Sequence, residues 1–159
     1  MLEMFTTDLE TNKTTKTKQY QKGNWINLVA PSEEEIKTVC ESVQIKEDFI
    51  RYALDYEEKA RIDIEDEDNT ILFIIDVPVL EKEGDSLIYS TMPIGIIFVR
   101  DDYFITVSIK KNEIIQNLNP NQRKNLITYK KSRFLLQILY ENRSEERRVG
   151  KECSSRWSP

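Results

Sequence analysis

Residues 70–79 carry an apolar side chain at nearly every position. A strand with one face in water alternates apolar and polar residues, whereas a strand buried on both faces shows no such alternation. After Thr70, only Asp76 and Pro78 interrupt the apolar run. The segment therefore predicts a central strand in a sheet that is covered on both of its faces.

A helix is predicted directly after Pro31. Ser32 is placed to cap its N-terminus, and Glu35, three residues on, completes a capping box. The apolar residues that follow repeat at helical spacing and predict one buried stripe, formed by Ile36, Val39, Cys40 and Val43. A second helix is predicted over residues 47–57, with Phe49, Ile50, Ala53 and Leu54 buried.

The other periodic segments predict strands before and after these two helices in the sequence. Strands are predicted over residues 2–6, 25–29, 61–66 and 103–109, and residues 87–99 are predicted to form one long strand or two strands joined near Pro93. A polar loop is predicted over 8–23, turns at 65–69 and 84–85, and helices over 113–118 and from Gln122 onward. The later strands are joined by hairpin-length connections. This order predicts an α+β fold, a three-layer α/β/α domain with a largely antiparallel mixed sheet.

The periodic pattern stops at Asn142. Residues 143–159, RSEERRVGKECSSRWSP, follow neither a helical nor a strand period and resemble an in-frame translation of a sequencing adapter. We expect residues 1–142 to form the native domain, ending in a truncated helix whose natural continuation is missing. Residues 143–159 are then expected to be a disordered, non-native tail.

Composition excludes several classes of function. Residues 1–142 carry 18 Lys and Arg against 25 Asp and Glu, a net charge of −7, which argues against nucleic acid as a partner. The absence of histidine excludes Cys/His zinc sites and Ser-His-Asp triads, and no other enzyme signature is present, so no catalytic residue is assigned. The apolar stretches are far shorter than the ~20 residues that span a bilayer, so we expect the chain itself to be soluble.

Two groups of carboxylates are candidates for binding a hard cation. One group lies on and after the predicted strand at 61–66 and comprises Asp63, Glu65, Asp66, Glu67 and Asp68. Alternatively, these residues form a turn whose charged side chains face water and bind no cation. The other group, Asp55, Glu57 and Glu58, ends the second predicted helix, where negative charge opposes the helix dipole. Either a cation or pairing with Lys59 and Arg61 would compensate for that charge.

An ordered set of segments resembles one family. The segments are Gly23–Leu28 followed by Pro31, residues 54–63 leading into 71–74, residues 93–97, 103–107 and 131–135. Together they resemble the N-terminal cytoplasmic domain of the CorA family of magnesium/cobalt transporters. The resemblance implies a homopentameric parent protein in the cell membrane that transports Mg²⁺ or Co²⁺. It places this domain on the cytoplasmic side, without the stalk, the membrane helices and the pore, and so unable to transport by itself.

The resemblance also implies how Mg²⁺ regulates the parent protein. Mg²⁺ is a possible regulatory ligand held between neighbouring cytoplasmic domains, where it stabilises the closed channel, and no other cofactor is required. The candidate residues for such an inter-subunit site are Asp55, Glu57 and Glu58, followed by Asp63 and Glu65. The chain departs from the family where some members carry an acidic pair, because Arg51 and Tyr52 stand there, and Ala60 replaces a common proline.

Two other functions are compatible with the same residues. The first is a free-standing soluble binding module without catalytic activity. The second is a metal-dependent hydrolase that uses the carboxylates of residues 63–68, among them Asp63 and Glu65. The sequence beyond codon 142 distinguishes the transporter hypothesis from the binding-module hypothesis. The hydrolase hypothesis predicts that substitution of both Asp63 and Glu65 abolishes Mg²⁺-dependent turnover.

Overall fold

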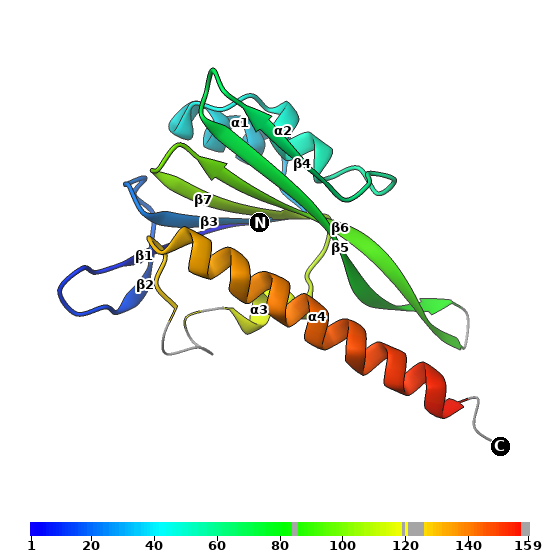
Figure 1. Cartoon of the computed structure of the whole chain (residues 1–159). Coiled ribbons are helices and arrows are strands. Elements are labelled where there is room, and N and C mark those ends of the chain that lie inside the picture. Colours follow the sequence, from blue (N-terminus) through cyan, green and yellow to red (C-terminus); the bar gives the residue numbers. More distant parts are fainter. Residues whose placement is uncertain (84–85, 119, 121–125, 157–159) are drawn as a thin grey trace.

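The computed structural model describes residues 1–83, 86–118, 120 and 126–156. Seven strands form one sheet in the order β2-β1-β3-β7-β6-β5-β4 (Figure 1). The strands are β1 Leu2–Thr7, β2 Thr14–Thr17, β3 Asn24–Val29, β4 Arg61–Glu65, β5 Thr70–Glu83, β6 Ser86–Val99 and β7 Tyr103–Ser108. The helices are α1 Glu33–Val43, α2 Asp48–Tyr52, α3 Glu113–Asn117 and α4 Lys131–Arg156.

Neighbouring strands are antiparallel except for β3 and β7, which run parallel. The parallel pair arises because the chain leaves β3 through α1 and α2, builds the hairpins β4 to β6, and returns beside β3 as β7. Pro93 lies in β6 just beyond the last residue paired with β7, Ile94, so its missing N–H breaks no bond to that strand. The predicted largely antiparallel mixed sheet is confirmed.

Helices cover both faces of the sheet. α1 and α2 bury one face, where Ile26, Leu28, Leu72 and Ile74 pack against their apolar stripes. α3 and α4 lie on the other face, above Trp25 and Phe104 among others (Figure 1). Two separate cores follow from this arrangement, and the predicted three-layer α/β/α order is confirmed.

The capping box that predicts α1 is present. The Glu35 N–H donates to the Ser32 hydroxyl at 3.2 Å, and the Ser32 N–H donates to the Glu35 carboxylate at 3.0 Å. The predicted stripe is buried at all four positions, Ile36, Val39, Cys40 and Val43. Local signals therefore decided both the start of this helix and the face that it buries.

The second helix is much shorter than predicted. α2 ends at Tyr52, and the N–H groups of Leu54 and Asp55 then donate to carbonyls three residues back in tight turns. A helix over residues 47–57 would place Asp55 and Glu57 in its last turn, where they oppose the helix dipole. The chain instead places these acidic residues in the loop that leads to β4.

The segment predicted as a polar loop, residues 8–23, contains a strand. β2 pairs antiparallel with β1, and the Thr7 and Thr14 hydroxyls lie 2.7 Å apart across the pair. Threonine is β-branched and favours an extended backbone, but β2 itself has no apolar residue to mark it as a strand. A neighbouring strand supplies the hydrogen bonds that the sequence pattern does not reveal.

The last helix also differs from the expectation. α4 begins at Lys131, whereas its predicted start at Gln122 lies outside the described residues, as does the predicted turn at 84–85. It continues through residue 156, so the expectation of disorder after Asn142 is wrong for residues 143–156. Arginine, lysine and glutamate favour helices, and Glu145 pairs with Arg148 one turn on. That residues 143–159 are non-native stays a prediction.

Candidate functional site

The candidate carboxylates lie at one edge of the sheet. Asp55, Glu57 and Glu58 belong to the loop between α2 and β4, whereas Asp63 and Glu65 belong to β4, the edge strand. Asp63 pairs with Leu72 of β5, so its side chain lies on the α1–α2 side of the sheet. The fold therefore brings both candidate groups to the same corner of the domain.

Arg61 neutralises two of these carboxylates. Its Nε donates to Asp63 Oδ2 at 2.7 Å, and one of its terminal nitrogens forms an ion pair with Glu58. The hydrogen bond to Asp63 is the main reason that the pKa of Arg61 is raised. The guanidinium also lies 4.9 Å from the ring centroid of Tyr52. Local pairing, the alternative to a cation, is thus realised at Glu58 and Asp63.

Lys46 performs the same role for Glu65. Its ammonium lies 3.1 Å from Glu65 Oε2 and 3.9 Å from Asp68 Oδ2. The hydrogen bond to Glu65 is the first cause of the raised pKa of Lys46. Two carboxylates of the acidic segment 63–68 therefore share one lysine that comes from the loop before α2.

Asp55 and Glu57 form no ion pair among the described residues. Asp55 Oδ1 accepts a hydrogen bond from the Glu57 N–H at 3.0 Å, which fixes the backbone of the loop. In the part of the chain that the structure describes, no three acidic or cysteine side chains gather closely enough to hold a metal ion.

The loop that carries Asp55 and Glu57 is also anchored to β5. The Tyr56 hydroxyl donates to Glu81 Oε1 at 3.0 Å, and Lys110 forms a hydrogen-bonded ion pair with the same carboxylate. The hydrogen bond from Lys110 is the first cause that lowers the pKa of Glu81 to about 2. Sequence analysis missed this group because its members lie on three separate segments.

The lowered pKa of Glu81 predicts a pH dependence. The carboxylate has an ordinary pKa of 4.5, so its stabilising contribution is present above that value and is lost as the pH falls towards about 2. Glu81→Gln is expected to lower the melting temperature at pH 6 and to reduce its fall between pH 4.5 and 2. Thermal melts followed by circular dichroism measure this, with Glu41→Gln on the exposed side of α1 as the control. An unchanged pH profile would contradict the role of Glu81.

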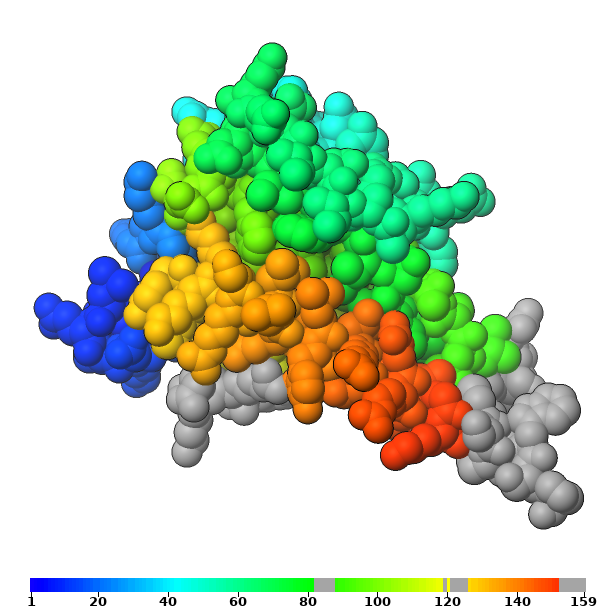
Figure 2. Space-filling model, viewed as in Figure 1, coloured from blue at the N-terminus to red at the C-terminus, as the bar shows by residue number. Residues whose placement is uncertain are grey.

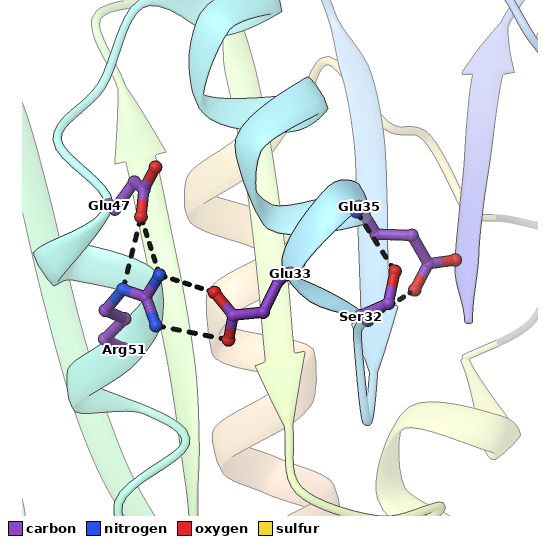
Figure 3. Close-up of polar contacts among 5 residues, drawn as sticks. All are labelled: Ser32, Glu33, Glu35, Glu47 and Arg51. Carbon is purple, nitrogen blue, oxygen red and sulfur yellow. Dashed lines mark hydrogen bonds and ion pairs between the residues drawn. The ribbon is translucent and has the colours of Figure 1, made fainter.

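Arg51 forms a second missed cluster, with Glu33 and Glu47 (Figure 3). Its Nη2 donates to each of the two carboxylates at 2.7 Å, and its Nη1 and Nε donate further hydrogen bonds to Glu33 and Glu47, respectively. The hydrogen bond from Arg51 also lowers the pKa of Glu33. The guanidinium thus links the first turn of α1 to the residue before α2.

The Arg51 cluster lies where the chain departs from the family pattern, in which some members carry an acidic pair. Where the resemblance places an acidic pair, the chain has a fixed cation that neutralises two carboxylates of its own domain. The spacing of Glu47 and Arg51, four residues apart on a helix, was a readable signal for half of the cluster. The contact with Glu33 depends on how α1 and α2 pack, and no local signal reveals it.

Comparison with known proteins gives the family and the fold. Residues 20–147 match the model of a family described as CorA-like Mg²⁺ transporter protein. The complete CorA magnesium transporter of Methanocaldococcus jannaschii is 21% identical, with a TM-score of 0.76 over 98% of this chain and 48% of that chain. The soluble domain of the same transporter is 21% identical, with a TM-score of 0.79 over 98% of this chain and 61% of that chain. The ZntB cytoplasmic domain of Vibrio parahaemolyticus is 14% identical, with a TM-score of 0.71 over 96% of this chain and 62% of that chain.

The structural likeness and the family model show different things about the chain. At such identities the likeness shows the fold alone, and the chain spans about half the length of the complete transporter chain. Comparison with curated proteins finds no match. None of the described helices is both long enough and apolar enough to cross a bilayer. The family model nevertheless covers most of the sequence, and on that evidence the chain belongs to the CorA-like Mg²⁺ transporter family.

Proposed function

We propose that this chain is the cytoplasmic regulatory domain of a homopentameric membrane transporter for Mg²⁺ or Co²⁺. The observation that carries the proposal is the match of 98% of this chain to only 48% of a complete magnesium transporter. The domain does not conduct ions by itself, because the pore belongs to the remainder of the parent protein. It acts through the position that it takes relative to its neighbours.

We further propose that Mg²⁺ is the regulatory ligand and binds between neighbouring copies. Mg²⁺ prefers six oxygen ligands in a near-octahedral arrangement and keeps several waters. Asp55 and Glu57 are the best placed ligands, because they are exposed and carry no ion pair within the described chain. Glu58, Asp63 and Glu65 are already paired with Arg61 or Lys46 and would contribute only if those pairs opened. The second copy supplies the remaining ligands.

The proposed function is tested on the gene of the parent protein. Membership of the CorA family implies that the native codons after Asn142 encode a long helix and two apolar membrane spans, with the Gly-Met-Asn signature that marks the pore of this family. The complete gene should restore growth of a bacterium that lacks Mg²⁺ uptake in low-Mg²⁺ medium, whereas a stop codon after residue 142 should not. A native stop codon at that position, or a complete gene without Mg²⁺ or Co²⁺ uptake, would favour the free-standing binding module.

The inter-subunit Mg²⁺ site predicts a weak response of this chain alone. Millimolar MgCl₂ is expected to change the melting temperature by no more than about 1 °C, because an incomplete site adds little binding free energy to the folded state. Differential scanning fluorimetry at constant ionic strength measures the shift, and NaCl is the control. A saturable rise of several degrees that disappears in Asp55→Asn/Glu57→Gln would show instead that one copy holds a complete site.

A further inference from the structure

A cavity lies between α3 and the strands β1 and β3. Its volume is about 260 Å³, and its lining comes from β1, β3 and the residues at and before the start of α3. We call it the β1–α3 cavity. In Figure 2, β1 and β2 form the blue surface on the left, whereas α4 crosses the front in orange and red. β1 and β3 lie in the half of the sheet that is far from β4, so the cavity is separate from the corner that carries Asp55 and Glu57.

One wall of the β1–α3 cavity is apolar. It consists of four side chains that are no more than 7% exposed, namely Phe5, Trp25, Val29 and Ile115. The Phe5 and Trp25 rings are stacked, with their centroids 4.9 Å apart. An apolar cavity of about 150 Å³ is large enough to bind benzene. The β1–α3 cavity therefore has room for one ring and a short polar substituent.

The side-chain amide of Asn27 offers the cavity a hydrogen-bond donor. Trp25 Nε1 donates to the Thr106 hydroxyl at 2.9 Å, and this hydroxyl donates to Asn27 Oδ1 at 2.8 Å. An indole nitrogen can only donate, so the two bonds fix which end of the amide faces Thr106. Asn27 lines the cavity, and within the described residues its Nδ2 donates to no other group.

Asn112 offers a second donor. It lines the same cavity and is 7% exposed. Its Oδ1 accepts a hydrogen bond from the Ile115 N–H at 2.9 Å and so caps α3. Its Nδ2 is buried and has no hydrogen-bond partner among the described residues. A buried donor without an acceptor destabilises the folded state, so this group requires a partner that the described chain does not supply.

Lys111 adds a positive charge to the two donors. It lines the cavity, is exposed and forms no ion pair in the part of the chain that the structure describes. The other charges of the lining are already paired, Glu3 with Lys16 at 2.8 Å and the Met1 α-ammonium with Glu35 at 2.8 Å. Donors that surround an unpaired ammonium favour an anion with more than one acceptor oxygen, such as a carboxylate.

We propose that the β1–α3 cavity binds a small aromatic monocarboxylate. The ring packs against the apolar wall formed by Phe5 and Trp25. The carboxylate accepts hydrogen bonds from Nδ2 of Asn27 and Nδ2 of Asn112 and pairs with Lys111. The site goes beyond the proposed transport of Mg²⁺ or Co²⁺ and does not depend on it, because every group that it needs belongs to the described domain.

The test uses phenylacetate, which joins one ring to one carboxylate, and two matched compounds. Phenethyl alcohol keeps the ring without the charge, and acetate keeps the carboxylate without the ring. The 159-residue chain, labelled with nitrogen-15, is titrated at constant ionic strength, and the side-chain NH₂ signals of Asn27 and Asn112 are followed by NMR. We expect phenylacetate to shift both signals saturably with a Kd of about 0.1–1 mM, as suits a ligand of about ten non-hydrogen atoms. Each matched compound should bind at least about tenfold more weakly, because it lacks one of the two recognised parts.

Substitutions assign the binding to the cavity. Asn112→Asp removes the Nδ2 donor but keeps an oxygen that caps α3, so it should weaken phenylacetate binding at least about tenfold. Asn117→Asp makes the same change at an exposed position of α3 outside the cavity and should leave the Kd unchanged. Lys111→Gln changes an exposed side chain without disturbing the fold and should weaken binding about twofold to fivefold.

Three results would overturn the proposal. Equal binding of phenylacetate and phenethyl alcohol would show that the amides and Lys111 do not recognise a carboxylate. Unchanged affinity in Lys111→Gln and in a folded Asn112→Asp variant would place the ligand elsewhere on the chain. Absence of saturation below about 10 mM phenylacetate would show that water alone fills the cavity.

Discussion

Replacing Phe134 with alanine is expected to lower the free energy of unfolding by about 3–5 kcal/mol. The ring is 1% exposed and lies between Trp25 and Phe104, with centroid distances of 4.8 and 4.5 Å. Its removal leaves a cavity where α4 meets the sheet, and the surrounding aromatic rings can close that cavity only in part. Urea unfolding followed by far-ultraviolet circular dichroism measures the change.

The matched control for this prediction lies on the same helix. Leu136 is 65% exposed, so Leu136→Ala removes a similar apolar group without opening a cavity and should change stability by less than about 0.5 kcal/mol. Similar effects of the two substitutions would contradict the position of α4 on this face.

The second large effect is expected at Gly95 in the middle of β6. A Cβ atom at this position would lie 2.3 Å from the Cβ of Ala53, which is fully buried at the end of α2. Neither a methyl group nor the strand backbone can move aside easily, so Gly95→Ala is expected to cost up to about 3 kcal/mol. The melting temperature should fall accordingly, and the loop that carries Asp55 and Glu57 should be displaced.

A compensating substitution isolates the cause of this effect. Ala53→Gly removes the methyl group that the new Cβ would meet, at a cost of about 0.5–1 kcal/mol for the added backbone freedom. In that background, Gly95→Ala should cost much less than in the native chain, which a double-mutant cycle reports as a coupling energy. If the cost is the same in both backgrounds, the close approach of α2 to β6 is not its source.

The secondary-structure elements that could be predicted are those marked by patterns among residues close together in the sequence. The Ser32–Glu35 capping box and the stripe at Ile36 and Val39 concern neighbours on one helix, so they define α1 without reference to the rest of the fold. β2 has no such signal, because its threonines become a strand only beside β1. The contact of Ala53, the residue after α2, with Gly95 of β6 likewise joins distant segments, and no local pattern indicates it.

The same distinction applies to the candidate site. Pairing of Arg61 with Glu58 was foreseeable, because the two residues lie three positions apart in the chain. The pairs Arg51–Glu33, Lys46–Glu65 and Lys110–Glu81 join residues from separate elements, and no local pattern indicates them. These distant bases decide which carboxylates remain available to a cation.

The sequence by itself determined the family, the three-layer architecture and the two groups of candidate carboxylates, among them Asp55 and Glu57. Periodicity and capping are local properties, and a sheet with an apolar central strand has few ways to bury both faces. Only the tertiary structure decided that Lys46 neutralises Glu65, and that Ile62 and Ile64 lie in water. Burial and ion pairing depend on residues that are distant in sequence, so they become defined only when the layers pack.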